Sequence, residues 1–231
     1  MSKITAAITS VGAYVPEFVL TNKMLEEMVD TNDEWILSRT GIKERRILKD
    51  PYKGTSYLAI QAALDLLEKS KVNPEEIDVV IVATATPDMM VASTAAYVAT
   101  EIGAIHAFAY DLQAACSGFL YGMSTAAAYI EAGRYKKVLL IGADKMSSIL
   151  DYTDRTTCII FGDGAGAVLL EKTESDAGLM KTILKTDGSG VSSLAVPAGG
   201  SRNPTSMQSL LHRTHYLKQD GAFVFKRAVA A

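Results

Sequence analysis

Residues 107–130 read AFAYDLQAACSGFLYGMSTAAAYI, and this stretch decides how the rest of the chain is interpreted. Residues 107–111 form an apolar run that predicts a strand, and residues 116–130 have the composition of a helix. Cys116 stands where the strand turns into the helix. Unpaired backbone N–H groups and the positive end of the helix dipole at such a position favour a thiolate, the nucleophilic form of cysteine.

A packing role is the alternative for Cys116, because a buried cysteine behaves as a small hydrophobe. Position alone leaves both interpretations open. The neighbours are small (Ala114, Ala115, Ser117 and Gly118), and they leave room for a substrate to approach the sulfur. These small neighbours therefore favour the catalytic interpretation of Cys116.

The order of elements around this stretch indicates an α/β protein. Residues 79–83 and 138–141 are continuous apolar runs without alternation, as expected of central strands covered on both faces. A helix over 93–102, the strand at 107–111 and the Cys116 helix lie between them. Such alternation predicts a mostly parallel sheet with helices on both faces, whose ligands gather at the carboxyl ends of the strands.

The remaining segments carry weaker signals. Apolar character predicts strands over 4–15, 159–161 and 179–185, and a second strand from the glycines at 162–166 to residue 170. Capping residues and apolar periodicity predict helices over 21–29, 31–38, 55–67 and 222–231, with a further helix start at 73–76. The pattern restarts near residue 178, which hints at an internal duplication.

Composition places the chain among ordinary globular proteins. Of its 231 residues 48% are hydrophobic, and the net charge of −3 gives no reason to expect nucleic acid binding. The N-terminus lacks the features of a signal peptide. Two cysteines, Cys116 and Cys158, make a poor disulfide framework, so we expect free thiols in the cytoplasm.

Residues 112–130 carry no charge and are long enough to raise the possibility of a membrane span. They contain several small and polar residues, among them Gln113, Gly122 and Ser124. A helix of this kind fits better between two layers of protein than in lipid. We therefore expect no membrane segment.

Three motifs together resemble β-ketoacyl-acyl carrier protein synthase III. They are DTNDEWILSRTGI at 30–42, AACSGF at 114–119 and TDRTTCIIFGDGAGA at 153–167. The resemblance implies the thiolase-like fold, with duplicated βαβαβ halves in αβαβα layers. It places an N-terminal half at 1–172 and the start of an incomplete second half at 173–231. It also implies a cytoplasmic homodimer.

The same resemblance implies a condensing acyltransferase that initiates fatty acid synthesis. Cys116 would take a short acyl group from acyl-CoA, and malonyl-acyl carrier protein would then lose CO₂ and attack the acyl-enzyme. Covalent catalysis of this kind replaces one difficult step by two easier ones. The Cys116 amide would donate to the developing oxyanion. Acyl-CoA is a substrate here, and neither a resident cofactor nor a metal is expected.

Five residues are assigned to the CoA-binding site by resemblance. Trp35 and Arg155 would hold the adenine between them, Arg39 would meet the phosphates, and Thr31 and Phe225 match two further contact positions. Without the motif, Trp35 would be read as a core aromatic and the arginines as solvated ion pairs. Periodicity alone predicts simple helix packing for Phe225.

The sequence departs from the family in two places. The histidine and asparagine that drive decarboxylation, with their His-x-Ala-Asn context, are absent, and His106, His212 and His215 do not match them. We therefore read the chain as the N-terminal two-thirds of such an enzyme, inactive in condensation by itself. Val91 and Ala92 stand where many relatives carry Phe-Pro, in a loop that in the family reaches the partner subunit's acyl pocket. The smaller side chain predicts a larger pocket.

Two other functions stay open. Another condensing enzyme of the thiolase superfamily is the near alternative, although the Trp35 and Arg39 motif argues against it. A non-catalytic acyl-CoA-binding fragment is the second, because the decarboxylation residues are missing. A redox role is disfavoured because the chain lacks a Cys-x-x-Cys pair. Gly162–Gly166 lacks the phosphate-loop lysine, and Cys158 is expected in the core.

Overall fold

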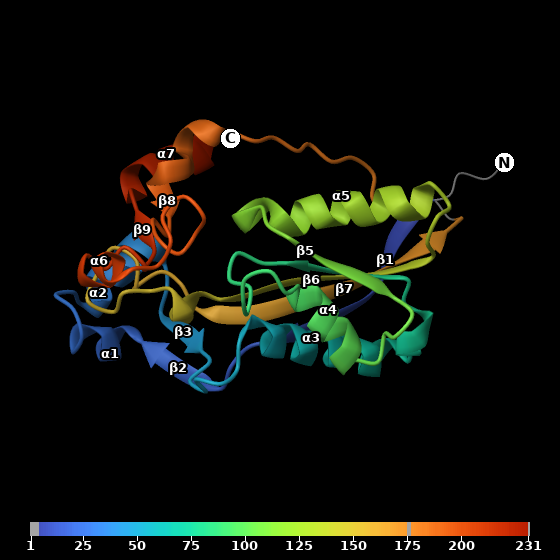
Figure 1. The fold of residues 1–231 in the computed structure, drawn as a ribbon, viewed down its shortest axis with the longest axis horizontal. Coiled ribbons are helices and arrows are strands. Elements are labelled where there is room, and N and C mark those ends of the chain that lie inside the picture. The colour runs from blue at the N-terminus through green and yellow to red at the C-terminus, as the bar shows by residue number, and fades with distance from the viewer. Residues whose placement is uncertain (1–4, 175–176, 231) are drawn as a thin grey trace. The chain divides into compact units, whose positions relative to one another are not determined.

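The computed structural model describes residues 5–174 and 177–230. These residues form two compact units, each assembled from segments that are distant in sequence (Figure 1). Unit 1 comprises residues 1–17, 48–145 and 163–184, and unit 2 comprises 18–47, 146–162 and 185–231, apart from the residues outside the description. The boundary predicted at residues 172 and 173 between two halves stays a prediction. It falls at the end of a long strand.

Unit 1 contains Cys116 with the strand before it and the helix after it. Its strands are β1 (Thr5–Tyr14), β4 (Val79–Ala83), β5 (Phe108–Leu112), β6 (Lys137–Lys145) and β7 (Asp163–Thr173). Its α-helices are α3 (Thr55–Ser70), α4 (Thr94–Glu101) and α5 (Gly118–Glu131), and its 3-10 turns are η1 (Pro74–Glu76) and η2 (Ala115–Ser117).

The strands of unit 1 make one mixed sheet in the order β1-β7-β6-β4-β5. β4 runs parallel to both β5 and β6, as the alternation of strands and helices predicts. β7 runs antiparallel to β6 and to β1, so the sheet is not parallel throughout. The direct connection from β6 through η3 (Met146–Ser148) to β7 carries no crossover helix, which is why β7 returns antiparallel.

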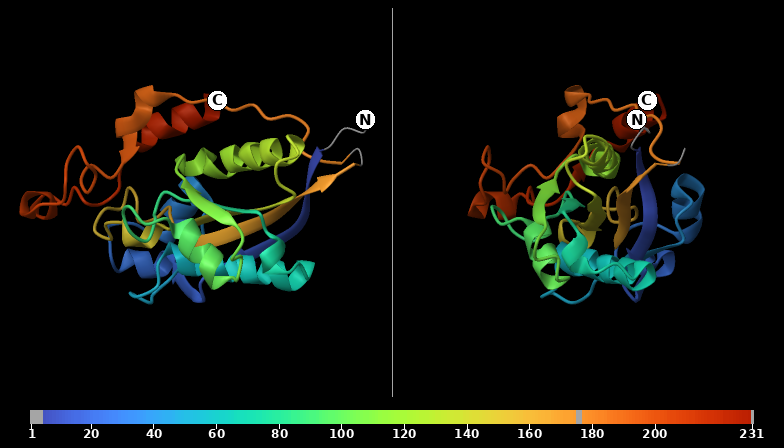
Figure 2. Two further views of the ribbon diagram at one scale, coloured as in Figure 1. Left: turned by 45° about the vertical axis from the view of Figure 1, so that its right-hand side comes forward. Right: turned by 90° about the vertical axis from the view of Figure 1, so that its right-hand side faces the viewer.

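Helices cover both faces of this sheet, which explains the unbroken apolar runs. α3 and α4 pack on one face through a core that includes Leu66, Val98 and Leu139. α5 packs on the other face through Met123, Ile130 and Leu140. Figure 2 shows α5 on one side of the sheet and α3 and α4 on the other. Every residue of β4 is buried, as expected of a central strand.

Three local expectations are wrong. Residues 159–161 form no strand, because Ile159 and Ile160 lie in a turn-rich segment stabilised by local bonds such as Ile160 N–H to Thr157 O. Residues 179–185 form no strand, although four of the seven are apolar. The helix predicted to start at 73–76 is only the short 3-10 turn η1. Apolar composition does not specify pairing, which needs a partner strand.

Unit 2 is built from short elements. They are β2 (Phe18–Thr21), α1 (Asn22–Glu26), α2 (Asp33–Thr40), β3 (Glu44–Ile47), η3, η4 (Gly188–Ser193), β8 (Leu194–Ala195), α6 (Met207–Leu211), β9 (Lys218–Gln219) and α7 (Gly221–Ala230). β2 pairs with β3 and β8 with β9, both antiparallel. A small core of Leu20, Leu25, Ile36, Ile47, Cys158 and Ile159 joins α1, α2 and the segment before β7.

Among the described residues no helix combines the length and the apolar character that crossing a bilayer requires. Helix α5, which lies in the uncharged stretch considered as a possible membrane span, has 14 residues. Gly122 explains its close packing on the sheet. A Cβ at Gly122 would stand 2.5 Å from Cδ1 of the buried Leu140.

Candidate active site and nucleotide cluster

Cys116 lies in η2, directly after β5 and immediately before α5. Its side chain is exposed, so the predicted access to the sulfur is present, and the packing interpretation is wrong for this residue. The cap residue Ser117 makes no side-chain cap bond, and no acidic residue occupies the first turn of α5. Backbone N–H groups and the helix dipole are therefore the electrostatic features nearest the sulfur in sequence.

Ala115 gives this turn its shape. Its φ of +45° lies in the left-handed region, which is unusual for a residue with a side chain. The strained residue directly precedes Cys116 and turns the chain sharply from β5 into α5. Gly118 then allows the helix to approach β4, since a Cβ there would stand 3.3 Å from Cβ of Ala83. Strain of this kind tends to accumulate at functional sites.

Trp35, Arg39 and Arg155 form one cluster in unit 2. The guanidinium carbon of Arg39 lies 5.1 Å from the centroid of the Trp35 ring, and that of Arg155 lies 5.3 Å from it. Trp35 and Arg39 are one turn apart on α2, which places them on the same face. Arg155 comes from the segment before β7. The structure therefore brings together three of the five residues assigned to the CoA site.

Helix α2 is positioned by caps at both ends. The Asn32 side chain accepts a hydrogen bond of 2.8 Å from the Trp35 N–H, and Gly41 closes the helix with φ of +71°. The capping position expected at Thr31 is therefore taken by Asn32, one residue later. Thr31 Oγ1 is buried and has no hydrogen-bond partner among the described residues. Its hydroxyl retains the capacity to bond a ligand.

Phe225 lies on α7 with 70% of its surface exposed. The expectation of simple helix packing is wrong for this residue. Phe223 makes the packing contact of α7 instead, since its ring lies 2.9 Å from where a Cβ on Gly190 would stand. The role of Phe225 as a CoA contact stays a prediction.

Val91 lies in the loop between β4 and α4 of unit 1. It is fully exposed, with φ of +77°, and its neighbours Met89 and Met90 are 61% and 71% exposed. A β-branched residue seldom adopts this backbone conformation. The tip of the loop is therefore an apolar, strained surface feature.

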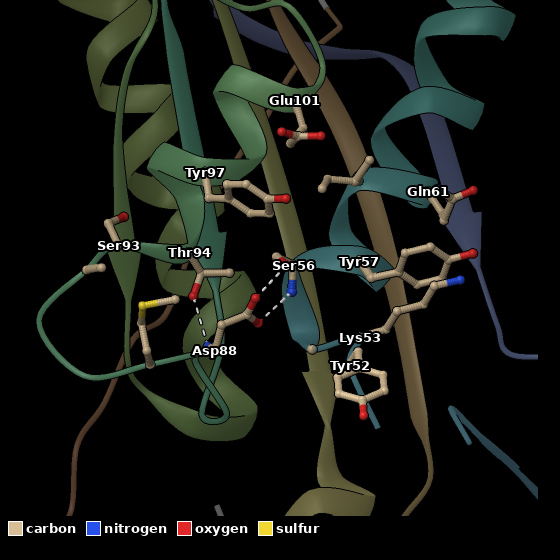
Figure 3. Close-up of a pocket in the computed structure, with 14 residues that line it drawn as sticks. Tyr52, Lys53, Ser56, Tyr57, Gln61, Asp88, Ser93, Thr94, Tyr97 and Glu101 are labelled. Atoms are coloured by element: carbon tan, nitrogen blue, oxygen red, sulfur yellow. Dashed lines mark hydrogen bonds between the residues drawn. The ribbon is translucent and has the colours of Figure 1, made fainter. Parts of the chain in front are cut away.

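Asp88 fixes the base of the same loop. Its carboxylate accepts hydrogen bonds of 2.8 Å from Ser56 N–H and 2.5 Å from Ser56 Oγ, and its own N–H lies 3.4 Å from Thr94 Oγ1 (Figure 3). Ser56, Asp88 and Thr94 line a cavity of about 640 Å³ between α3 and α4. Tyr57 and Tyr97 also line this cavity, but Cys116 does not.

Cys158 is buried in the core of unit 2, as expected. Burial is the largest of several influences on its thiol and raises the pKa to about 11. Cys158 is thus held as a thiol near neutral pH. In the part of the chain that the structure describes, no group of three acidic, histidine or cysteine side chains is placed to hold a metal ion.

Sequence reasoning missed several residues that make hydrogen bonds within unit 2. Asp30 accepts a 2.7 Å hydrogen bond at its carbonyl from Arg155 Nη1. Asn22 and Arg45 are buried beneath α2, and Asp151 binds Arg213 with two bonds of 2.5 and 2.7 Å. Nothing in the local pattern marks Asn22 or Asp151. Arg45 stands at an apolar position of a strand, which is a faint signal for a buried charge.

The chain is similar to known proteins of one family. A family model described as 3-oxoacyl-[acyl-carrier-protein (ACP)] synthase III matches residues 110–188. The chain is 54% identical over 230 residues to beta-ketoacyl-[acyl-carrier-protein] synthase III 1 of Bacteroides thetaiotaomicron, covering 100% of this chain and 69% of the relative. It is 55% identical over 230 residues to the synthase III of Phocaeicola vulgatus, with the same coverage.

The chain belongs to the 3-oxoacyl-[acyl-carrier-protein] synthase III family. Crystal structures of synthases III agree: that of Aquifex aeolicus has a TM-score of 0.84 at 40% identity, covering 96% of this chain and 66% of its own. That of Thermus thermophilus has a TM-score of 0.86 at 43% identity, covering 97% and 68%. The thiolase-like fold is thereby confirmed. The chain spans about two-thirds of the length of these synthase III relatives.

Proposed function

We propose that this protein is a condensing acyltransferase in which Cys116 takes a short acyl group from acyl-CoA. The acyl group is then joined to malonyl-acyl carrier protein with loss of CO₂. Membership of the synthase III family supports the reaction class. The observation that carries the proposal is the exposed Cys116 between β5 and α5, because a nucleophile needs both access and stabilisation of its anion.

The acylation step follows from this placement. The Cys116 thiolate attacks the thioester carbonyl, a C–S bond forms, and CoA leaves as its thiolate and takes up a proton. The tetrahedral oxyanion requires donors, and backbone N–H groups at the start of α5, including that of Cys116, suit this task. The left-handed Ala115 keeps the turn tight enough to present the sulfur and these donors together.

The cluster in unit 2 supports CoA as the acyl donor. Trp35 offers an aromatic face to the adenine, Arg155 a second planar surface, and Arg39 a guanidinium for phosphate. The unpartnered hydroxyl of Thr31 adds a hydrogen-bonding group. The exposed Phe225 is assigned to the pantetheine arm by family resemblance.

The loop bearing Val91 supports a homodimer. Its base is held by Asp88 while its apolar tip is exposed, which suits insertion into a pocket of a second copy. We propose that Val91 lines the partner subunit's acyl pocket. A valine occupies less volume than a phenylalanine, so primers longer or more branched than acetyl are expected to fit.

Intact-mass spectrometry tests the acylation step. Incubation with isobutyryl-CoA is expected to add one acyl group, and Cys116→Ala is expected to abolish the adduct. Binding of the CoA ester without an adduct would favour the non-catalytic alternative. An adduct that persists in Cys116→Ala would contradict the assignment of the nucleophile.

Primer choice and condensation need separate measurements. Acylation rates with acetyl-, isobutyryl-, isovaleryl- and octanoyl-CoA test the larger pocket, and a strong preference for acetyl-CoA would contradict it. The acylated protein is then given malonyl-acyl carrier protein, and formation of a β-ketoacyl product measures the condensation step.

A further inference from the structure

Arg45 is a buried cation in β3, with 4% of its surface exposed. Its Nε donates a 2.9 Å hydrogen bond to the Ile159 carbonyl, its Nη2 donates to the same oxygen, and its Nη1 donates to Asn22 Oδ1 at 2.5 Å. Among the described residues none of these partners is a carboxylate. Burying a cation without a direct counter-ion is costly, so the position calls for an explanation.

Asn22 extends this network to the first residue of α2. Its Nδ2 donates hydrogen bonds of 2.7 Å to Asp33 Oδ1 and 2.8 Å to the Ile42 carbonyl. Asp33 opens the helix that bears Trp35 and Arg39, and Ile42 follows the end of that helix. A single amide therefore contacts the chain at both ends of α2, and the Arg45 guanidinium holds that amide.

Ile159 connects the other side of the network to Arg155. The chain between them is tightly turned: the N–H groups of Thr157 and Cys158 both donate to the Asp154 carbonyl at 3.2 Å. Residues 154–159 therefore form a compact turn. A shift of the Ile159 carbonyl would displace the backbone that carries Arg155.

We propose that Arg45 is a positioning residue that sets the separation between Trp35 and Arg155, and hence the fit of the adenine in acyl-CoA. The inference rests on the proposed function of that cluster. A planar guanidinium suits this task because its rigid fork reaches the Ile159 carbonyl and the Asn22 amide at the same time. Arg45 contacts no substrate and acts through the two segments that it joins.

The test compares two acyl donors that differ only in the nucleotide. The rate of Cys116 acylation is measured by intact mass with isobutyryl-CoA and with isobutyryl-pantetheine, which lacks the adenosine phosphate portion. Wild-type protein is expected to react faster with the CoA ester at low concentration. In Arg45→Met this preference should fall roughly tenfold, while the rate with isobutyryl-pantetheine stays unchanged.

Arg46→Met is the matched control. Arg46 is the next residue of β3, is more exposed, and lies 3.8 Å from Glu44 across an exposed ion pair. Its replacement removes an equal charge without touching Ile159 or Asn22, so the preference for the CoA ester should persist. Arg45→Lys keeps the buried charge but loses the fork, and it should show a partial loss of preference. If Arg45→Met does not fold, the preference for the CoA ester is compared between Arg45→Lys and the wild type.

The outcomes separate this inference from the function on which it rests. A wild-type protein that does not prefer the CoA ester contradicts the nucleotide cluster itself, and the inference falls with it. A wild-type preference that Arg45→Lys and Arg45→Met retain in full overturns the positioning role alone. So does an equal loss of rate with both donors, because a general structural defect would not discriminate between them.

Discussion

The Arg155 guanidinium lies against the Trp35 ring, with its central carbon 5.3 Å from the ring centroid. An adenine placed between the two planes needs them about 7 Å apart, twice a contact distance of about 3.5 Å. The proposed CoA site therefore requires Arg155 to swing outward before an adenine can enter. Its hydrogen bond to the Asp30 carbonyl and its exposed ion pair with Asp30 are the contacts that this movement changes.

Trp35 is the single tryptophan of the chain, so its fluorescence reports on this cluster alone. CoA is expected to quench the emission as adenine replaces Arg155 on the ring. Arg155→Ala should weaken binding roughly fivefold to tenfold, because one stacking surface is lost. Arg202→Ala, an exposed arginine of the same unit, serves as the control. An unchanged affinity in Arg155→Ala would remove Arg155 from the site.

The two cysteines should differ sharply in reactivity. Iodoacetamide at pH 8 is expected to modify Cys116, which is exposed, and to spare Cys158, which is buried with a pKa raised to about 11. Peptide mapping of the folded and urea-unfolded protein measures this difference. Labelling of Cys158 at the rate of Cys116 in the folded protein would contradict the structure.

Gly122→Ala should destabilise the protein by about 1–2 kcal/mol, because overpacking against the buried Leu140 exceeds the gain in helix propensity. The added Cβ would stand 2.5 Å from Leu140 Cδ1. Gly166→Ala is the control, since a Cβ there meets nothing within 4 Å. Urea unfolding of both variants measures the difference. Equal midpoints would show that α5 has room to move away from the sheet.

Val91→Gly should stabilise the chain by about 0.5–1 kcal/mol. A side chain in the left-handed region costs about 1–2 kcal/mol, and the extra freedom of glycine in the unfolded chain offsets part of the gain. The control is Val191→Gly, an exposed valine of η4 without positive φ, which should lose stability. Thermal unfolding measures both. A lower melting temperature for Val91→Gly would indicate that the Val91 side chain makes a stabilising contact.

Asp151 predicts a loss of stability in acid. Its hydrogen bonds from Arg213, opposed by burial and helped by bonds from Thr153, hold the pKa of this carboxyl well below its usual range. The folded state thus favours the carboxylate. The stabilisation is fully present above the ordinary value of about 3.9 and fades as the pH falls below it.

Arg213→Met should remove part of the dependence of folding stability on pH. The variant is expected to be less stable than the wild type at pH 7, and this difference in stability should shrink as the pH falls below about 4. Lys172→Met, from an exposed ion pair of 3.4 Å with Glu174, should have little effect at either pH. Urea unfolding from pH 7 to pH 3 measures the difference. A constant penalty across this range would rule out the Asp151 carboxylate as its source.

The fold class, the central strands and the place of Cys116 between a strand and a helix could be predicted from the sequence alone. β4 and β6 are recognisable because strands covered on both faces must be apolar at every residue. Cys116 is recognisable because a strand, a few small residues and a helix follow one another locally. The motif around Trp35 and Arg39 is likewise local, since both lie on one helix.

How segments distant in sequence meet is visible in the three-dimensional structure and not in the sequence. The sequence does not reveal that β7 pairs antiparallel with both β1 and β6, because apolar composition carries no information about the partner strand. Nor does it reveal that Arg45 donates hydrogen bonds to the Ile159 carbonyl and to Asn22 Oδ1. The bond to Ile159 joins residues 114 positions apart in the sequence, and the bond to Asn22 joins residues 23 positions apart. A hydrogen bond depends on where its atoms lie in space, which local periodicity does not encode.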